Sequence, residues 1–389
     1  MRRLTLAAGI IVALGSLQPA AARDVTGFAA QLDMAMQEVQ VRYGFPGATA
    51  AIALPDGTIV TTATGLADVE TGRAMTAATP MLAASIGKTF VAATILMLES
   101  EGRLSRSDPL AAHLGDRAWF DRLPNGDSMT IDQLLHHSAG LPDHVHLPAF
   151  QTAWAQMMQD GRIIQPDDLV GFVLRMEPLF DAGAAWAYSD TGYILLGLVI
   201  EKVTGQRYTD ILRRRFLDPL ALSGTFASDS KDLPGLAVGY VAPDNRFGLP
   251  ERTADPQGRL LWNPAVEWTG GGLASTSSDL ARWGHLLFGG AALTQPYLDR
   301  MLDSVSVAPD DPGIRFGAGV AIHADTPHGP AYGHGGWIPG YVSSLRHYAD
   351  HGVTVAFQIN TDAGLMDGES DLIPVLEARL ADLATGFVR

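Results

Sequence analysis

From Ser85 to Gly102 the chain reads Ser-Ile-Gly-Lys-Thr-Phe-Val-Ala-Ala-Thr-Ile-Leu-Met-Leu-Glu-Ser-Glu-Gly, which predicts an amphipathic helix closed by a glycine. The helix begins at Ser85, and Lys88 lies one turn further on the same face. A serine is a weak nucleophile until a neighbouring base takes its proton. A helix N-terminus adds a positive field and a backbone N–H that can stabilise an oxyanion. The pair therefore predicts an activated serine.

Ser-x-x-Lys alone is weak evidence, and the chain contains a second copy, Ser228-Asp-Ser-Lys231, in a segment typical of a solvated loop. Gly87-Lys88-Thr89 also matches the end of a phosphate loop. That loop needs a glycine five residues before Gly87, where the chain has Leu82. The sequence has no Gly-x-Ser-x-Gly elbow and no His-Glu-x-x-His zinc helix.

The segments around the Ser85 helix predict one sheet assembled from both ends of the chain. At the amino end, residues 28–43 have helical spacing, and Asp56-Gly57 between two short β-like runs predicts a hairpin. At the carboxyl end we expect strands at 316–323, 341–348 and 353–358 and a closing helix at 371–383. The long segment between them is mostly helical. We expect one unit, residues 23–389, with an α/β lobe (about 23–105 and 305–389) and an inserted helical lobe (about 106–304).

Two further motifs follow the Ser85 helix. Tyr188-Ser189-Asp190 precedes another helical segment, and a tyrosine phenol becomes a plausible base when cations hold it as phenolate. Alone, this tripeptide is more typical of a packed tyrosine. Tyr332-Gly-His-Gly-Gly-Trp337 has glycines that let a backbone approach a substrate, and a following strand could present an N–H to a carbonyl oxygen. Alone, it is equally a loop leading into a strand.

The three motifs in this order resemble the serine β-lactamase and penicillin-binding protein superfamily. The similarity is greatest to the branch of class C β-lactamases, D-alanyl-D-alanine carboxypeptidases and family VIII carboxylesterases, and it extends from about Phe45 to Leu383. The resemblance implies an α/β, β-lactamase/transpeptidase-like fold with an antiparallel sheet flanked by helices. It also implies roles for the motif residues. Ser85 would be the nucleophile, Lys88 its proton acceptor or the cation that primes Tyr188, and Tyr188 the base and later the acid.

The same resemblance places the backbone N–H groups of Ser85 and Trp337 in an oxyanion hole and His334 in the cationic position of the third motif. Asp190, Gly335 and Gly336 fall at substrate-binding positions. Two residues depart from the family pattern. Asp190 replaces the usual asparagine, so an ion that only accepts hydrogen bonds replaces an amide. Gly335 stands where a hydroxyl residue commonly helps to hold a substrate carboxylate. Both departures weaken the case for a penicillin-like substrate and favour neutral esters or amides that carry a nearby amine.

Composition restricts location and partners. Met1-Arg-Arg, an apolar run to Leu17 and Ala20-Ala-Ala22 are typical of a secretory leader, so we expect residues 1–22 to be removed and the protein to be periplasmic or secreted. The apolar run is shorter than the roughly 18 residues of a spanning helix, so no stable membrane anchor is expected. The chain has no cysteine and a net charge of −15, which makes nucleic acid a poor partner.

The histidines at 136, 137, 144 and 146 form a local cluster, but no carboxylate spacing completes a metal site, so neither a metal nor an organic cofactor is expected. The leading function is hydrolysis of an amide, peptide or ester bond of a small-molecule or peptide substrate through an acyl-enzyme. The carboxypeptidase or β-lactamase-like reading ranks level with a carboxylesterase. A binding module or sensor that has lost turnover is the alternative from another class. The oligomeric state cannot be predicted from the sequence.

Overall fold

The protein is described by a computed structural model covering residues 24–389 except 244, 246, 309–310 and 366–369. The leader expected at 1–22 lies outside these described residues. Within them the main sheet has nine strands in the order β3-β2-β1-β12-β11-β10-β9-β8-β7. Its strands are β1 (Gly47–Ala53), β2 (Ile59–Asp68), β3 (Arg73–Ala74), β7 (Val305–Ala308), β8 (Asp311–Gly317), β9 (Val320–His323), β10 (Ala331–Ile338), β11 (Tyr341–Tyr348) and β12 (Val353–Ile359).

Strand β1 pairs with β12, so the two ends of the chain meet inside one antiparallel sheet, as the sequence predicts. The predicted Asp-Gly hairpin joins β1 to β2. Asp56 Oδ1 accepts a hydrogen bond from the Thr58 N–H at 2.9 Å, and Gly57 takes the positive φ of +83° that this turn requires. A small second sheet consists of β4 (Met81–Leu82), β6 (Leu273–Ser275) and β5 (Phe226–Ala227).

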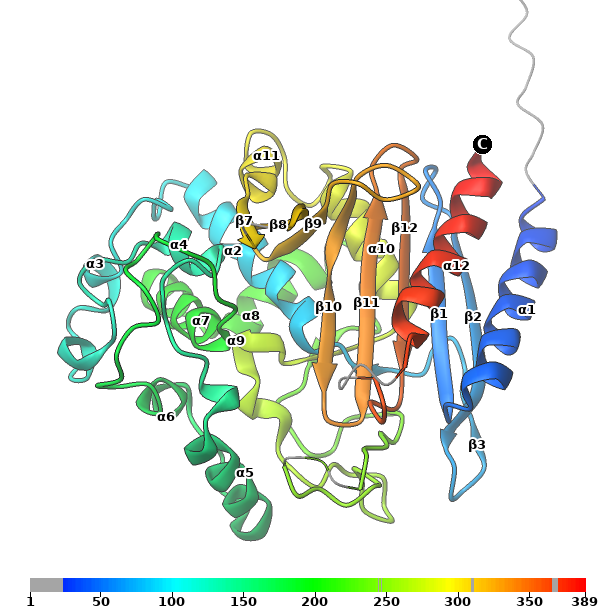
Figure 1. The fold of residues 1–389 in the computed structure, drawn as a ribbon, viewed down its shortest axis with the longest axis horizontal. Coiled ribbons are helices and arrows are strands. Elements are labelled where there is room, and N and C mark those ends of the chain that lie inside the picture. Colours follow the sequence, from blue (N-terminus) through cyan, green and yellow to red (C-terminus); the bar gives the residue numbers. More distant parts are fainter. Residues whose placement is uncertain (1–23, 244, 246, 309–310, 366–369) are drawn as a thin grey trace, which may run out of the picture.

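Helices cover both faces of the main sheet and form a separate group beside it (Figure 1). The α-helices are α1 (Val25–Tyr43), α2 (Gly87–Ser100), α3 (Ala111–Leu114), α4 (Ile131–Leu135), α5 (Pro148–Asp160), α6 (Pro166–Gly171), α7 (Asp190–Thr204), α8 (Tyr208–Leu212), α9 (Trp268–Gly271), α10 (Ser277–Phe288), α11 (Tyr297–Leu302) and α12 (Leu372–Val388). Shorter helical turns are η1 (Ala84–Ile86), η2 (Phe120–Arg122), η3 (His144–His146), η4 (Arg213–Leu217) and η5 (Pro264–Val266).

Helices α1 and α12 lie side by side on one face of the sheet, where the rings of Phe28 and Phe387 stack 4.3 Å apart. Helix α10 packs on the opposite face, although its residues fall in the range that the sequence assigns to the helical lobe. A Cβ on Gly284 of α10 would meet the Thr354 and Leu345 side chains at 2.7 and 2.8 Å, so a glycine is needed for this close contact. Because both faces are covered, every residue of β1 and β12 is buried.

One segment near the carboxyl end differs from the sequence prediction. Residues 316–323 do not form one strand: they belong to β8 and β9, which turn at Ala318-Gly319. Gly319 has a φ of +68°, and a Cβ there would lie 2.8 Å from the Lys88 carbonyl oxygen, because the turn rests on α2. The third motif lies inside β10, so of its two interpretations the loop before a strand is not the one observed.

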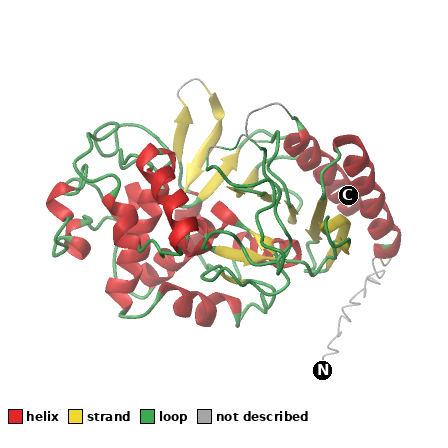
Figure 2. Cartoon of the chain, turned by 90° about the horizontal axis from the view of Figure 1, so that it is seen from below, coloured by secondary structure: helices red, strands yellow, loops and turns green. Residues whose placement is uncertain are grey.

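Strand β10 pairs with β11 along its whole length but with β9 only at residues 331–333. On the β9 edge, the stretch from His334 to Ile338 therefore has no strand beside it among the described residues, and β10 contacts the helical turn η1. A cleft lies here, lined by residues of β10 and of the helical group. In the view from below, that group lies at the opposite end of the molecule from the helices beside the two termini (Figure 2). No helix among the residues with described structure combines the length and apolar character needed to cross a membrane.

Candidate active site

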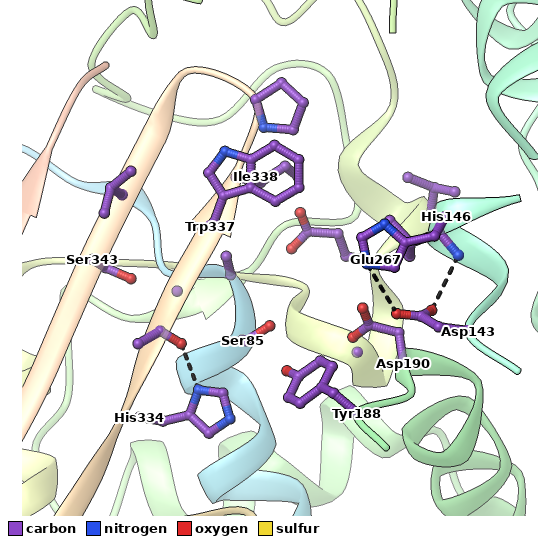
Figure 3. Close-up of a pocket in the computed structure, with 18 of the residues that line it drawn as sticks. Ser85, Asp143, His146, Tyr188, Asp190, Glu267, His334, Trp337, Ile338 and Ser343 are labelled. Atoms are coloured by element: carbon purple, nitrogen blue, oxygen red, sulfur yellow. Dashed lines mark hydrogen bonds and ion pairs between the residues drawn. The ribbon is translucent and has the colours of Figure 1, made fainter. Parts of the chain in front are cut away.

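Ser85 lies at the base of this cleft, in the one-turn helix η1 that leads directly into α2 (Figure 3). The sequence predicts the start of the helix at Ser85, and the structure adds a tighter first turn. Ala84, the residue before Ser85, has a φ of +48°, which is uncommon for a side chain with a Cβ. This conformation is held from outside: Ser343 of β11 donates a hydrogen bond to the Ala83 carbonyl oxygen at 2.8 Å.

Glycines on two other elements let the backbone pack closely around η1. A Cβ on Gly336 of β10 would lie 2.2 Å from the Ala83 carbonyl oxygen and from Ser343 Oγ. A Cβ on Gly271 of α9 would lie 2.6 Å from the Ala84 carbonyl carbon. Both distances are shorter than real Cβ contacts allow. Strand β10 and helix α9 therefore fix the position of the serine from opposite sides.

Lys88 is fully buried beneath Ser85. Its Nζ donates to Ser85 Oγ at 3.1 Å, to Asp190 Oδ1 and to the Gly270 carbonyl oxygen. Three acceptors match the three hydrogens of an ammonium group. The arrangement thus describes a lysine that is paired with Asp190 and is in hydrogen-bond contact with the serine hydroxyl.

Tyr188 faces the same hydroxyl from the side of α7, and the Lys88 Nζ lies 4.9 Å from the centre of its ring. Burial raises the pKa of the Tyr188 phenol well above 10, and the Asp190 carboxylate raises this pKa further, while the Ser85 hydroxyl opposes the shift. The phenol is therefore protonated in the empty cleft. The cation expected to hold it as phenolate is present, but its charge is compensated by Asp190.

His334 is buried at the position where the resemblance places a cation, and its surroundings favour the neutral imidazole. Burial lowers its pKa to about 3, and the nearby Lys88 charge acts in the same direction. Its Nδ1 donates to the Gly335 carbonyl oxygen at 2.5 Å, which leaves Nε2 as a buried acceptor without a hydrogen-bond partner among the described residues. Burial cannot be seen in the tripeptide His-Gly-Gly, so the sequence could not indicate the charge.

The structure brings the other motif residues to the same cleft. Ser85, Tyr188, Asp190 and residues 334–337 all line a cavity of about 480 Å³. Ser85 and Trp337, whose N–H groups the resemblance places in an oxyanion hole, both line it. Gly335 differs from Gly336: a Cβ built on Gly335 meets nothing closer than the Ser343 carbonyl oxygen at 3.9 Å. Position 335 therefore has room for a side chain. No steric constraint explains why this chain has a glycine where the family commonly has a hydroxyl residue.

Two carboxyl groups in the cavity were missed by sequence reasoning. Asp143 follows the Gly-Leu-Pro loop, and Glu267 immediately precedes α9. Burial, together with the negative charge of Asp190, raises the pKa of Asp143 to about 7 and that of Glu267 to about 8. The sequence offered one indication of Asp143, namely its place at the end of the segment before the second motif. No sequence pattern indicated Glu267.

Aromatic rings form another wall of the cavity. Phe150 and Trp154 of α5 lie 5.8 Å apart, Trp154 and Phe247 5.1 Å, and Phe247 and Trp337 6.1 Å between ring centres. The Trp337 indole N–H donates to Asp362 Oδ2 at 2.8 Å, which fixes the orientation of this ring. The cavity therefore has an apolar wall beside the serine and a carboxyl-rich region on the side away from β10 (Figure 3).

The four clustered histidines do not converge. His136 is buried between the Asp132 and Asp303 carbonyl oxygens, His137 contacts the ring of Tyr188, and His144 bonds to Thr191. His146 points into the cleft near Asp143. Among the described residues no group of three or more His, Cys, Asp or Glu side chains is arranged to hold a metal ion.

Known proteins resemble this chain in sequence and fold. Penicillin-binding protein 4* of Bacillus subtilis (strain 168) is 26% identical over 273 residues, which are 68% of this chain and 57% of that protein. The chain thus matches little more than half the length of this relative. The crystal structure of a D-stereospecific amidohydrolase from Streptomyces sp. is 28% identical with a TM-score of 0.73, covering 85% of this chain and 94% of that one.

The D-amino acid amidase from Ochrobactrum anthropi SV3 has the same fold, with a TM-score of 0.76 at 24% identity over 92% of this chain and 97% of that one. The model of the Beta-lactamase family matches residues 28–380. This range contains the sheet, the helical group and all three motifs. The chain is therefore a member of the Beta-lactamase family, whose fold supports serine hydrolases with amidase and carboxypeptidase relatives.

Proposed function

We propose that this protein is an exported serine hydrolase that cleaves an amide or ester bond through an acyl-enzyme on Ser85. The observation that carries the proposal is the contact of Lys88 Nζ with Ser85 Oγ at 3.1 Å, below a phenol that faces the same oxygen. A nucleophile in hydrogen-bond contact with its proton-transfer partners at the base of a cavity is the arrangement that acyl transfer requires.

In the proposed reaction Ser85 Oγ loses its proton and bonds to the substrate carbonyl carbon. The carbonyl oxygen becomes an oxyanion, which the backbone N–H groups of Ser85 and Trp337 would stabilise. Collapse of this intermediate breaks the bond to the amine or alcohol, which leaves with a proton. Water then attacks the acyl-enzyme and releases the acid. No metal or organic cofactor is part of this proposal.

The proton passes through Lys88 and Tyr188, but neither is a free base in the empty cleft, because the phenol is protonated and the lysine donates to three acceptors. Substrate binding therefore has to change the protonation of this pair before Ser85 is attacked. A protonated phenol is suited to the later step, in which the leaving group takes up a proton. His334, being neutral, would act as a polar wall of the site.

The charges of the cleft favour neutral or amine-bearing substrates over carboxylates. Asp190 carries a negative charge beside the nucleophile, and the space at Gly335 holds no hydroxyl to anchor a carboxylate. A β-lactam or a C-terminal D-alanine presents a carboxylate close to the reacting bond. We therefore place an amidase or carboxylesterase activity ahead of a β-lactamase or carboxypeptidase activity. Relatives named D-stereospecific amidohydrolase and D-amino acid amidase support the amidase choice.

The decisive experiment labels the purified protein with a fluorophosphonate probe and maps the modified peptide. We expect the label on Ser85 in the wild type and none in Ser85→Ala. Ser228→Ala is the matched control, because Ser228 belongs to the second Ser-x-x-Lys sequence. The same samples are assayed with a p-nitrophenyl ester, an amino acid amide and a chromogenic cephalosporin. Hydrolysis that survives in Ser85→Ala, or a complete lack of labelling and turnover, would contradict the proposal and favour a binding module.

A further inference from the structure

Four carboxyl groups of the described residues line the cavity, and two of them are paired with a cation. Asp190 bonds to Lys88, and Glu377 lies 3.1 Å from an Arg346 guanidinium nitrogen. Asp143 and Glu267 have no lysine or arginine partner among the described residues. Lys88 and Arg346 are thus already paired with carboxyl groups, whereas the buried acids Asp143 and Glu267 have no such partner.

Asp143 is nearly enclosed, with 8% of its side chain exposed. Its Oδ1 accepts the Val145 N–H at 3.1 Å. The other oxygen, Oδ2, is buried and lacks a hydrogen-bond partner among the described residues, although the backbone N–H of Asp190 also acts to lower the pKa of this carboxyl. The basic atom beside it is Nε2 of the half-exposed His146 at 3.6 Å. This histidine compensates the carboxylate only when it is protonated.

Glu267 precedes α9 and lines the same cavity. Its Oε2 is buried and has no hydrogen-bond partner in the described part of the chain. Burial and the Asp190 charge raise the pKa of Glu267 to about 8, while Lys88 opposes the shift. The groups that face the two acids are Asp190, Lys88, Tyr188, His144 and His146. Of these groups Lys88 is the cation, and it is already paired with Asp190.

A buried acid without a partner costs free energy, because it gives up hydration whether it ionises or stays neutral. Such a cost is typical of a functional site whose missing partner is a ligand. An organic ammonium supplies that partner: it donates up to three hydrogen bonds and restores the charged form of both carboxyls. A carboxylate ligand would instead lie beside two further carboxyl groups, those of Asp143 and Glu267.

We infer that Asp143 and Glu267 form a subsite that binds an ammonium group of the substrate, beside the carbonyl that acylates Ser85. The inference rests on the proposed function and narrows its substrate class to amides or esters of amino acids. The aromatic wall of Phe150, Trp154, Phe247 and Trp337 faces the same cavity, so the substrate carries a large apolar or aromatic side chain. Figure 3 shows Asp143 and Trp337 in different directions from Ser85, so the ammonium group and the apolar side chain of the ligand would lie apart.

The test compares two probes that differ in one group, 2-phenylethylamine and 2-phenylethanol, by isothermal titration calorimetry at pH 7.5. We expect the amine to bind the wild type at least tenfold more tightly. Asp143→Asn and Glu267→Gln should each reduce this preference about tenfold, with a larger loss in the double variant. Glu377→Gln is the matched control, since it removes a carboxyl from the same cavity that is already paired with Arg346. It should keep the preference.

Proton release gives a second readout that does not depend on stable variants. Because the pKa of Glu267 is raised to about 8, binding of the amine at pH 7.5 should release protons from this carboxyl, so the measured enthalpy changes between buffers of different ionisation enthalpy. Equal affinity for the two probes, or amine binding without proton release, would overturn the inference. These measurements need no turnover, so they test the ammonium subsite independently of the proposed function. The proposed function is tested by the labelling of Ser85.

Discussion

Asp190 is the residue that most clearly distinguishes this cleft from its family pattern, because it places a carboxylate where an amide is usual. It accepts a hydrogen bond from the buried Lys88 and raises the pKa of Tyr188, Asp143 and Glu267. A single charge therefore affects the proton pathway and the substrate preference together. An asparagine would keep the hydrogen bond to Lys88 but remove that field.

We predict that Asp190→Asn raises the ratio of β-lactam to ester kcat/KM by about five- to thirtyfold, or roughly 1 to 2 kcal/mol. The reason is that a carboxylate-bearing substrate no longer meets the negative charge at position 190. Steady-state kinetics on a cephalosporin and a p-nitrophenyl ester measure the ratio. An unchanged or lower ratio in a variant that unfolds at the wild-type temperature would show that charge at 190 does not determine substrate choice.

Tyr188→Phe tests the proton pathway at a single atom. The ring is buried and contacts His137, so removing only the hydroxyl should leave the packing intact. If the phenol relays the proton, kcat should fall on the order of a hundredfold or more. Stopped-flow measurement of acylation and deacylation shows which step is slowed. A loss below tenfold would assign the proton transfer to Lys88 alone.

Sequence motifs could predict which residues meet at Ser85, because each motif is a short pattern whose chemistry depends on residue type. Ser85, Lys88, Tyr188 and Asp190 do lie together in the structure. The unpaired acids could not be predicted in the same way. Asp143 and Glu267 lie in different loops on either side of the second motif, and only the fold brings their charges near Asp190. The neutral state of His334 depends on burial, which no local pattern records.

At the scale of elements, β10 carries two adjacent glycines with different functions. Gly336 lets the strand approach the Ala83 carbonyl, whereas Gly335 faces open cavity. Side chains alternate along a strand, so neighbouring glycines point to opposite sides and are constrained by different surroundings. The sequence Gly-Gly alone cannot distinguish a glycine required by packing from one that leaves room for a ligand.

This difference gives a matched pair of variants. Gly336→Ala should destabilise the protein by about 2 kcal/mol or more, because its Cβ would lie 2.2 Å from backbone and hydroxyl oxygens. Gly335→Ala should change stability by less than about 0.5 kcal/mol, since its nearest neighbour is 3.9 Å away. Urea unfolding of both variants measures the difference. Equal stabilities would mean that β10 is not held against the segment before Ser85.

Elements with a clear periodicity or turn signal were predicted well. The first hairpin, the strands at 341–348 and 353–359 and the last helix agree with the sequence pattern because alternation, Asp-Gly and helical spacing are local. The prediction of a single strand at 316–323 was wrong. The apolar residues continue across Ala318-Gly319, and the turn there depends on contact with α2, which the local sequence does not contain.

For the whole molecule, buried titratable groups of two kinds act on stability in opposite directions. Burial lowers the pKa of His144 and His347 to about 4 and that of His334 to about 3, and it lowers the pKa of His137 as well. These imidazoles are neutral in the folded state and become charged below pH 6.5 when the chain unfolds. The folded state therefore binds fewer protons there, and the free energy of unfolding decreases as the pH falls below 6.5.

The two unpaired acids produce the opposite slope at higher pH. Asp143 has a pKa of about 7 and Glu267 of about 8 in the folded state, against ordinary values of 3.8 and 4.5. The folded state then binds more protons than the unfolded chain, so the stabilisation that they contribute at low pH is lost as the pH rises through 7 and 8. Below pH 6.5 the four imidazoles change the free energy of unfolding more than the two carboxyl groups do. The balance predicts a stability maximum near pH 6.5.

We expect the free energy of unfolding, measured by urea titration from pH 5 to 9, to peak near pH 6.5 and to fall by about 2 kcal/mol toward pH 9. In the double variant Asp143→Asn and Glu267→Gln the amide groups do not titrate, so the alkaline decrease should become shallow while the acid decrease stays. It should not vanish, because burial also raises the pKa of Asp279 and Asp362. The acid decrease tests the histidines separately, since it persists in both proteins. An alkaline slope that is the same in wild type and double variant would show that these two acids ionise freely in the folded protein, and the need for a positive partner in the cleft would disappear with it.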